Sequence, residues 1–476
     1  MEGLGTNVYN YIETLFGSEA VKCYLEFVNK EPTQYLRVNS LKTNSEKTSR
    51  QLKEYYGVET ECIAGIPAAL RVKEKNDIIS RSLEHVIGEF YIQGLSSMLP
   101  PLVLDPKEGE IILDLCASPG SKTTGTGALM NNKGTLLANE IKLERVMTLI
   151  FNIDRMNLVN TGVLHYKGEL LSKIYNNYFD KVLVDAPCSG MGIIQKVGEV
   201  GTWWHLEKCM ALGELQFKLV MAALKMVKVG GEVVYSTCTM SVEENEMVIS
   251  KILDKLPVEL VEIELPVKSH AGITNYKEEA INPSLEKARR ILPWEADSDG
   301  FFICKLRKIG ETSPSVPFNL RTSNLKIVDY KHKEVNYLLK KLSGTFGIDY
   351  DVFKRYKYYK KTYDIFFLNE DWEDQNLGIF ERAGTRLGKI DKHDEITFHT
   401  QGAQLLSDEI TKNIYQVENN EELKKYINGG IIKKDISSEQ FIIKYKEYTL
   451  GTAIGGSEGI KSRFPRSKRT QGIYLL

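Results

Sequence analysis

The sequence lacks paired cysteine motifs and long apolar runs. Its seven cysteines are scattered and odd in number, with no CxxC pair and no Cys/His spacing typical of a zinc site. No run of about 18 apolar residues occurs, and the amino-terminal segment has neither the basic nor the apolar region of a secretory signal. We therefore expect a soluble protein of a reducing compartment, the cytoplasm, with no metal site and no membrane partner.

An excess of charge of one sign is also absent. The chain has 62 Lys and Arg residues against 63 Asp and Glu residues, so no global positive field attracts nucleic acid. Any such binding must use local basic patches. The length of 476 residues exceeds what one hydrophobic core usually supports, which predicts two or three domains.

Turn signals and composition divide the chain into three predicted domains. Residues 1–90 mix α and β, with a strand at Tyr35–Val38 and a helix at Ser45–Tyr56 that Asn44 or Ser45 opens. Residues 91–308 alternate strands and helices. A polar linker at 311–315 introduces the third domain, residues 309–476.

Two apolar segments that each run into a cysteine are the most informative part of the chain. KVLVDAPCSG contains Cys188 and VVYSTCT contains Cys238. Residues 208–228 between them have the apolar spacing of a helix, which Gly230 and Gly231 are expected to stop. A strand, helix, strand unit commonly leaves its two strands parallel and adjacent, with both carboxyl ends on one edge of the sheet. We therefore expect both thiols to face one substrate.

A loop rich in small residues, CASPGSK at 116–122, follows the first strong strand at 111–115. Backbone N–H groups and a helix N-terminus in this position typically meet a ligand. The pattern argues against a phosphate-binding loop because Ser121, rather than glycine, precedes Lys122, and the glycines also lack the dinucleotide spacing. These residues predict a nucleoside cofactor without a tightly cradled phosphate.

A carboxylate marks the end of the second predicted strand. Thr135–Asn139 runs into Glu140, which lies 20 residues beyond Gly120. A carboxylate at this distance commonly binds ribose hydroxyls in dinucleotide folds, and a solvated strand-end glutamate is the alternative. We expect Glu140 to lie beside the cofactor.

The succession of elements predicts the fold class. A helix at 143–156 and a third strand at 162–166 follow Glu140. Three strand and helix units before the Cys188 segment predict an α/β fold with a doubly wound, Rossmann-like parallel sheet. Asp299 and Gly300 predict a hairpin turn before a strand at 301–306, which would form an antiparallel edge.

Two thiols with unequal surroundings fit methyl transfer to C5 of cytosine. That carbon is a weak nucleophile until a thiolate adds to C6 and makes C5 enamine-like. Cys238 precedes Ser241 to Glu244, a capping box that predicts a helix start whose dipole favours the thiolate. Asp185 is placed to hydrogen-bond the N3/N4 edge of the base. A single buried cysteine is more often a small core residue, but two on adjacent strand ends argue against that interpretation.

Two basic segments follow in the third domain. Residues 353–363 interleave five basic with five aromatic residues, and residues 461–469 carry five basic residues in nine. Such interleaving suits phosphate contacts and base stacking, although a solvated basic strand or tail is the alternative for either segment alone. Together they favour RNA as the partner.

These motifs resemble the Sun/Nop family of RNA cytosine-5 methyltransferases. The similar segments are LDLCASPGSKTT, ANE, LVDAPCSGMG and VYSTCTMSVEENE, flanked by RVNSLK, YIQGLSSMLP and DGFFICKL, over about residues 35–307. The resemblance implies that Cys238 is the nucleophile and that Cys188 helps to release the methylated RNA. It also implies S-adenosylmethionine as the cofactor.

The resemblance further implies which residues hold the cofactor. They are Cys116, Ala117, Ser118, Pro119, Gly120, Ser121 and Lys122 of the loop, together with Glu140, Asp185 and the position of Lys167. Lys122 is expected to reach the active site as well, as a fourth catalytic residue beside Cys238, Cys188 and Asp185.

One departure concerns the segment after the third strand. The family usually has Asp-Gly-Arg there, and this chain has Lys167, Gly168 and Glu169. Because a lysine side chain cannot accept the hydrogen bond that an aspartate accepts, we expect weakened but retained cofactor binding.

The GSKTT form and the long carboxyl-terminal extension resemble the ribosomal small subunit methyltransferase F subgroup. By that resemblance, residues 1–90 form an RNA-recognition lead-in and residues 309–476 a PUA-like α+β RNA-binding region. The expected reaction is cytosine-5 methylation of 16S ribosomal RNA. The alternatives are a transfer RNA methyltransferase and an RNA-binding ribosome-assembly factor with weak activity. DNA is not an expected partner. Amide methylation does not fit because the strand end reads Asp185-Ala-Pro-Cys rather than Asx-Pro-Pro-aromatic.

Overall fold

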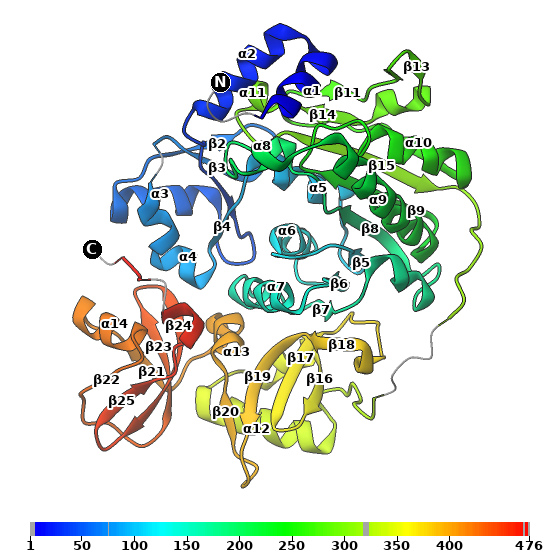
Figure 1. The fold of residues 1–476 in the computed structure, drawn as a ribbon. Helices are drawn as coiled ribbons and strands as arrows, with labels where there is room; N and C mark the ends of the chain where they lie inside the picture. Colours follow the sequence, from blue (N-terminus) through cyan, green and yellow to red (C-terminus); the bar gives the residue numbers. More distant parts are fainter. Residues whose placement is uncertain (1–4, 75, 318–322, 470–471, 475–476) are drawn as a thin grey trace.

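The computed structural model describes residues 5–74, 76–317, 323–469 and 472–474. Its three parts follow one another along the chain, from the helices at the amino terminus through a central sheet to two further sheets (Figure 1). No helix among the described residues combines the length and the apolar character needed to cross a membrane.

The amino-terminal part contains a four-stranded antiparallel sheet in the order β2-β3-β1-β4. The Oδ1 atom of Asn44 accepts the Lys47 N–H at 2.8 Å, so Asn44 caps α3 as predicted. The elements of this part are α1 (Thr6–Phe16), α2 (Ser18–Asn29), β1 (Tyr35–Val38), α3 (Ser45–Tyr56), β2 (Thr60–Ile63), β3 (Ile66–Val72), α4 (Leu83–Ile87), β4 (Phe90–Ile92) and α5 (Leu95–Leu104).

The central part is a mixed sheet whose order is β11-β14-β15-β9-β8-β5-β6-β7-β18, with β10 paired to β15. Its larger elements are β5 (Ile111–Asp114), α6 (Ser121–Leu129), β6 (Thr135–Asn139), α7 (Leu143–Arg155), β7 (Thr161–Leu164), β8 (Phe179–Asp185), α9 (Leu206–Met226), β9 (Val227–Thr237), α10 (Glu246–Lys255) and β15 (Phe301–Lys308). The shorter ones are α8 (Val200–Trp203), β10 (Val258–Val261), β11 (His270–Ala271), β12 (Asn275–Tyr276), β13 (Glu279–Ala280), β14 (Arg289–Ile291) and α11 (Pro293–Ala296).

Strands β9, β8, β5, β6 and β7 are parallel, and the strand order reverses between β8 and β5. This is the predicted doubly wound topology, and ligands bind at such a reversal, beyond the carboxyl ends of the strands. Apolar side chains of α5 and α7 cover one face of the sheet, and those of α9 and α10 cover the other. Helix α9 connects β8 to β9, so the two cysteine-bearing strands are adjacent as expected.

Three local predictions in this part are wrong. Gly230 and Gly231 do not stop the helix, because α9 ends at Met226 and both glycines lie inside β9. The capping box does not start a helix, because α10 begins at Glu246. Finally, Asp299 and Gly300 are not a tight hairpin turn, because α11 lies between β14 and β15, although these strands do pair antiparallel.

The carboxyl-terminal part contains a four-stranded sheet, β16-β17-β19-β20, and a five-stranded sheet, β21-β23-β24-β25-β22. Its elements are α12 (Lys333–Phe346), β16 (Tyr356–Lys361), β17 (Asp364–Asn369), β18 (Phe380–Ala383), β19 (Thr385–Ile390), β20 (Ile396–Phe398), α13 (Thr400–Leu405), β21 (Ile414–Gln416), α14 (Asn420–Ile427), β22 (Ile431–Ile432), β23 (Gln440–Tyr445), β24 (Tyr448–Gly456), β25 (Gly459–Ser462) and α15 (Arg466–Arg469). The division at residue 309 stays a prediction.

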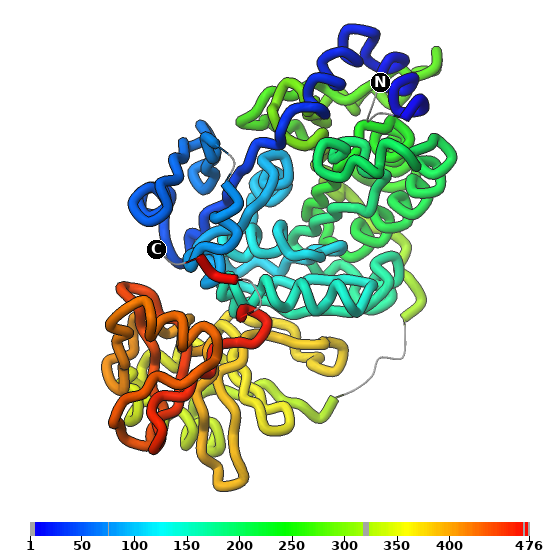
Figure 2. The backbone as a smooth tube through the Cα atoms, turned by 60° about the vertical axis from the view of Figure 1, so that its left-hand side comes forward, coloured from blue at the N-terminus to red at the C-terminus, as the bar shows by residue number. Residues whose placement is uncertain are grey.

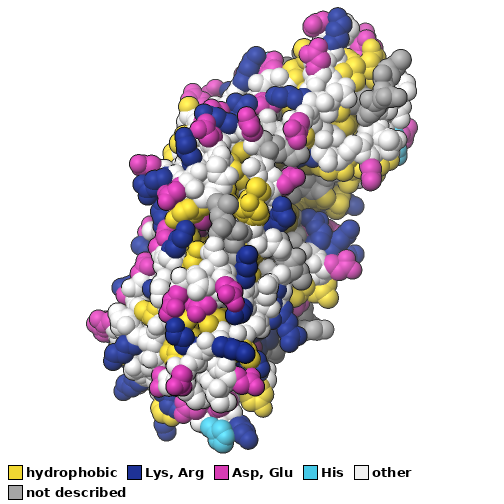
Figure 3. All heavy atoms as spheres, turned by 90° about the vertical axis from the view of Figure 1, so that its left-hand side faces the viewer, with side chains coloured by type: hydrophobic (Ala, Val, Ile, Leu, Met, Phe, Trp, Pro, Cys, Tyr) yellow, Lys and Arg dark blue, Asp and Glu magenta, His cyan; other side chains and the backbone are white. Residues whose placement is uncertain are grey.

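Backbone hydrogen bonds join this part to the rest of the molecule near β18 and near the last described residues, and side-chain contacts such as Tyr448 Oη to Glu84 Oε1 at 3.0 Å join it elsewhere. Strand β18 pairs antiparallel with β7 and so extends the central sheet. The last described residues return to the amino-terminal part, where the Tyr474 N–H donates to the Arg81 carbonyl at 2.9 Å (Figure 2). The face of the molecule shown in Figure 3 carries basic and acidic side chains interspersed, in keeping with the balanced composition.

Candidate active site

A cavity of about 200 Å³ lies at the predicted position, beyond the carboxyl ends of β5, β8 and β9. Its walls come from the loop after β5 and from residues on α5, β8 and the segments around β9 and β15. They are Ser97, Cys116, Ala117, Ser118, Pro119, Ser121, Lys122, Asp185, Ile193, Cys238, Asp299 and Phe301. Eight of the predicted site residues are therefore together, whereas Gly120, Glu140, Lys167 and Cys188 do not line this cavity.

The two cysteines are adjacent but differ in their access to the cavity. The Sγ atoms of Cys188 and Cys238 lie 3.0 Å apart, and both thiols are free. Cys238 lines the cavity and Cys188 does not, although both side chains are half-buried. The hydrogen bond to Cys238, together with burial and the nearby Glu244 carboxylate, raises the pKa of the Cys188 thiol well above its usual value. Cys188 therefore keeps its proton and can donate it in a hydrogen bond to Cys238 when that sulfur is a thiolate.

Lys122 places a positive charge beside Cys238. Its Nζ atom is 2.7 Å from Asp185 Oδ2 and donates to Ser97 Oγ at 2.9 Å. Burial alone would lower the pKa of Lys122, but the Asp185 carboxylate and the Cys238 thiol outweigh it and raise the pKa above its usual value. A charged ammonium group thus faces both the candidate nucleophile and the candidate base-binding carboxylate.

Asp185 is held by both of its oxygens. Oδ2 pairs with Lys122, and Oδ1 accepts the Ser236 hydroxyl at 2.8 Å. Ser236 lies on β9, two residues before Cys238, so the adjacent strands orient this carboxylate. The side chain nevertheless forms part of the cavity wall, where a bound base could reach it.

Glu244 ties the two cysteine loops together. Its Oε1 atom accepts the Ser189 N–H at 2.8 Å and the Gln216 amide at 3.0 Å. Its Oε2 atom accepts the Ser241 hydroxyl at 2.7 Å and the Ser189 hydroxyl. Ser189 follows Cys188, and Ser241 lies three residues beyond Cys238.

These bonds explain the failed capping box. Glu244 is fully buried and satisfies groups from the loop after β8, from α9 and from the turn before α10, so it does not cap a helix. Since α10 begins eight residues after Cys238, its dipole is not adjacent to that thiol. Lys122 supplies the positive charge that we had expected from the helix.

The loop at residues 116–122 leads into the N-terminus of α6 without a side-chain cap. Gly120 has φ of 104°, in the left-handed region, and a Cβ atom there would lie 3.0 Å from Leu149 Cδ1. No side chain caps α6, and its first residues Ser121 and Lys122 line the cavity, so its first backbone N–H groups could bind the carboxylate of a methionyl group.

Glu140 is not a solvated strand-end residue. Only 4% of it is exposed, Oε1 accepts the Lys142 N–H at 2.9 Å, and Oε2 is 3.5 Å from Arg145. Lys167 is exposed beyond the end of β7, on the same edge of the sheet. An oriented carboxylate beside an open helix N-terminus fits S-adenosylmethionine, with Glu140 placed for the ribose hydroxyls.

Four wall residues, Ser97, Ile193, Asp299 and Phe301, were not predicted as site residues from the sequence. Asp299 pairs with Lys196 at 2.7 Å at the cavity wall, although the sequence analysis treated it only as part of a turn. Phe301 lies under the Lys122 ammonium, 5.4 Å from Nζ to the ring centroid. Ser97 binds the same ammonium. The DGFF and SSML segments that contain three of them were the available signal.

Arg37 supports the site from the amino-terminal sheet. It is buried on β1, where Nε donates to Gln93 Oε1 at 2.8 Å and Nη2 donates to Thr124 Oγ1 at 2.7 Å. Thr124 belongs to α6, so the arginine fixes the helix that follows the cofactor loop. The segment RVNSLK, which contains Arg37, therefore helps to hold the active site in place.

The predicted base-stacking role of residues 353–363 is wrong for most of their aromatic residues. Phe353, Tyr358 and Tyr359 are buried, and the two hydroxyls donate to the carbonyls of Phe353 and Ala383. Within residues 461–469, Phe464 and Lys468 are buried as well. Tyr358 and Tyr359 are consecutive residues of β16 and so point to opposite faces of the sheet, where they pack into two different apolar clusters, so both faces are covered at this point. Phosphate contact by the exposed lysines stays a prediction.

Several known proteins are similar to this chain in sequence. Residues 101–307 match the family described as 16S rRNA methyltransferase RsmB/F. Ribosomal RNA small subunit methyltransferase F of Shewanella oneidensis is 31% identical over 450 residues, which cover 93% of this chain and 92% of that protein. The 28S rRNA (cytosine(4447)-C(5))-methyltransferase of Homo sapiens is 37% identical over 284 residues, 59% of this chain, and the chain spans 35% of its length.

A solved structure agrees with these matches. The methyltransferase homologue of Pyrococcus horikoshii superimposes with a TM-score of 0.57 at 31% identity, covering 63% of this chain and 93% of that one. The match to the Shewanella protein extends over nearly the whole of both chains, which confirms the resemblance inferred from the motifs. The chain belongs to the 16S rRNA methyltransferase RsmB/F family of S-adenosylmethionine-dependent RNA (cytosine-5) methyltransferases.

Proposed function

We propose that this protein methylates C5 of a specific cytosine in 16S ribosomal RNA through a covalent bond between Cys238 and C6. The observation that carries the proposal is the inequality of the two thiols. Cys238 lines the cavity beside the Lys122 ammonium. Cys188 does not line it, and its sulfur, 3.0 Å from that of Cys238, retains its proton.

Addition of the Cys238 thiolate to C6 makes C5 nucleophilic. Bound S-adenosylmethionine supplies the methyl group. The Lys122 charge favours the thiolate, and Asp185 is oriented to accept a hydrogen bond from the N4 amino group of the base. Each residue thus stabilises charge that develops as the adduct forms.

Release requires loss of the C5 proton and departure of Cys238 as a thiolate. The protonated Cys188 thiol donates a hydrogen bond to that sulfur at 3.0 Å, so it stabilises the leaving group. Because Cys188 does not line the cavity, Cys238 is the thiol placed to reach C6.

The full-length match to a small-subunit methyltransferase favours 16S ribosomal RNA as the substrate. Transfer RNA is the alternative, because a Pyrococcus abyssi relative named tRNA (cytosine(49)-C(5))-methyltransferase is 36% identical over 57% of this chain. We assign RNA recognition to residues 1–90 and to a PUA-like region at 309–476, and we place the reaction in the cytoplasm.

Transfer of labelled methyl groups tests the proposal. Purified 16S ribosomal RNA, small subunits and transfer RNA are incubated with the full chain and labelled S-adenosylmethionine, and bisulfite sequencing locates the product. We expect label in 16S ribosomal RNA, its loss in Cys238→Ala, and wild-type transfer by Cys62→Ala, which alters an exposed thiol on β2. Label in transfer RNA alone would reassign the substrate, and transfer by Cys238→Ala would refute the mechanism.

A further inference from the structure

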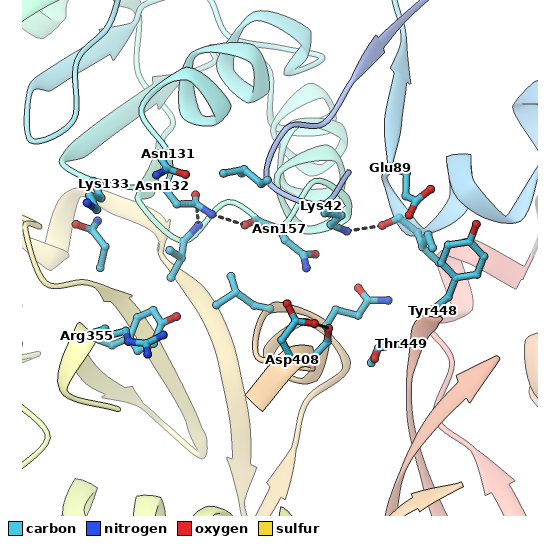
Figure 4. Close-up of a pocket in the computed structure, with 18 of the residues that line it drawn as sticks. Lys42, Glu89, Asn131, Asn132, Lys133, Asn157, Arg355, Asp408, Tyr448 and Thr449 are labelled. Atoms are coloured by element: carbon cyan, nitrogen blue, oxygen red, sulfur yellow. Dashed lines mark hydrogen bonds between the residues drawn. The ribbon is translucent and has the colours of Figure 1, made fainter. Parts of the chain in front are cut away.

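Cysteine side chains lie at the candidate active site rather than at a larger cavity of the molecule. All seven cysteines are free thiols, and Cys116 and Cys238 line the active-site cavity. The larger cavity, of about 810 Å³ at the amino ends of β6 and β7, is lined by amide and charged side chains such as Asn131, Asn157 and Asp408, with no cysteine among the described residues of its wall (Figure 4). A small oxidant that enters the active site therefore meets thiols.

The two cysteine loops are bound to each other on both sides of the sulfur atoms. Ahead of the thiols, the Ala186 N–H donates to the Ser236 carbonyl at 3.0 Å. Beyond them, the hydroxyl oxygens of Ser189 and Thr239 lie 2.9 Å apart, and each of these residues directly follows a cysteine. These bonds hold the backbones of the two loops beside each other, so the thiols of Cys188 and Cys238 stay neighbours.

The separation of the two sulfur atoms is close to that of a disulfide bond. The Sγ atoms of Cys188 and Cys238 lie 3.0 Å apart, and a disulfide bond is about 2.05 Å long, so the atoms must approach by about 1 Å. Small rotations of the two side chains can supply an approach of this size. Because Cys238 lines the cavity, a small reagent can reach it from solvent.

The thiols near the cavity differ in reactivity. The Lys122 ammonium beside Cys238 favours the thiolate, which is the form that attacks an oxidant. The hydrogen bond to Cys238, together with burial, raises the pKa of Cys188, which keeps its proton. Burial and carboxylates such as Asp114 raise the pKa of Cys116 well above its usual value, so that thiol is protonated as well. We therefore expect Cys238 to react first, with Cys188 next to it.

We propose that Cys188 and Cys238 form a reversible disulfide bond when the protein meets hydrogen peroxide, and that this bond switches methyl transfer off. The Cys238 thiolate attacks one peroxide oxygen and breaks the O–O bond, which gives a sulfenic acid and a hydroxide that takes a proton from solvent. The Cys188 sulfur then displaces the remaining hydroxide from Cys238, and its own proton converts that hydroxide to water. Overall, the two thiols lose two electrons and two protons, and one peroxide becomes two water molecules.

The disulfide bond both blocks and protects the nucleophile. A Cys238 sulfur bonded to Cys188 cannot add to C6 of a base; this effect on activity rests on the proposed function, whereas formation of the bond does not. A sulfenic acid without a neighbouring thiol is oxidised further to a sulfinic acid, which thiols do not reduce. In a reducing compartment a disulfide bond of this kind is transient, so cellular thiols would restore the active form.

Peroxide treatment of the reduced full chain, followed by peptide mapping without reductant, tests the proposal. We expect a crosslink between the peptides of Cys188 and Cys238, loss of two of the seven free thiols, and loss of methyl transfer in proportion to the crosslinked fraction. Dithiothreitol should reverse all three changes. Cys188→Ala should instead carry Cys238 as a sulfinic acid that dithiothreitol does not reduce. Cys116→Ala, which removes the other thiol of the cavity wall, is the matched control and should form the crosslink as the wild type does.

Competition between crosslinking and further oxidation decides the outcome. Conversion of wild-type Cys238 to sulfinic acid as fast as in Cys188→Ala would overturn the proposal, and so would a crosslink between Cys238 and Cys116. Full methyl transfer by the crosslinked chain would overturn the switch. A crosslink in a chain whose reduced form methylates no RNA would support the redox pair and count against the proposed function instead. If Cys188→Ala fails to fold, Cys188→Ser gives the same test, because a hydroxyl cannot form the disulfide bond.

Discussion

The sulfur atoms of Cys188 and Cys238 lie 3.0 Å apart, and of the two residues only Cys238 lines the cavity. Strands β8 and β9 end side by side, and each cysteine lies in the loop that follows, Cys188 three residues beyond β8 and Cys238 one residue beyond β9. Cys188 is placed to assist Cys238. Removing Cys188 should make the covalent intermediate accumulate, whereas removing Cys238 should prevent it from forming.

Cys188→Ala should trap the protein on its RNA. Without the thiol that donates to the leaving sulfur, the adduct forms but is released slowly, so a band that resists denaturation should accumulate on a gel. Cys238→Ala and the double variant should give no such band. Absence of the band in Cys188→Ala, with methyl transfer intact, would assign Cys188 a packing role.

Glu244→Gln should slow the reaction while leaving the fold in place. Glutamine keeps the shape but cannot accept from Ser189, Gln216 and Ser241 at once, so the two cysteine loops lose their common anchor. We expect kcat to fall roughly tenfold to a hundredfold with little change in KM, because small displacements of reacting groups have effects of this size. Ser241→Ala, which removes one donor, should fall by less. A loss confined to the unfolding temperature would contradict a positioning role.

The regular elements were predictable where local signals and tertiary packing agree. Asn44 caps α3 as its side-chain chemistry predicts, and Thr135–Asn139 forms β6 because its apolar run is buried on both faces. The reversal of strand order between β8 and β5 then follows from chain connectivity, which placed the cofactor loop and both thiols at one edge.

The failures share a physical cause, which is competition from distant partners. Ser241 and Glu244 have the spacing of a capping box, but Glu244 binds Ser189 and Gln216, 55 and 28 residues away, more favourably. The aromatic side chains of β16 were indistinguishable from stacking residues until β17 and β18 were known to cover them.

Lys167→Asp should tighten the binding of S-adenosylmethionine. The exposed lysine stands where the family usually has an acceptor, and a hydrogen bond to a charged group contributes about 1.5–3 kcal/mol, so the dissociation constant should fall about tenfold or more. Calorimetry without RNA measures it, and Lys218→Asp, an exposed position on α9, controls for the change in net charge. Unchanged affinity would show that Glu169 or the backbone already serves.

The carboxyl group of Asp114 should make the free energy of unfolding fall as the pH rises. This carboxyl group is buried at the end of β5, where burial and the Asp185 charge raise its pKa from 3.8 to about 7, against the opposing hydrogen bond from Thr123. Between these values the folded chain binds the proton more tightly than the unfolded chain does, so the contribution of this group to stability is lost from about pH 4 to about pH 7.

The variant Asp114→Asn cannot ionise. The difference between its unfolding temperature and that of the wild type should therefore become more positive, by about a few °C, as the pH rises from 5 to 8. Thermal unfolding at several pH values measures this difference, which is insensitive to any constant packing change. Asp435→Asn, at an exposed position, should show no such trend. A difference that stays level across this range would mean that Asp114 is ionised throughout, with Thr123 and Lys122 outweighing burial.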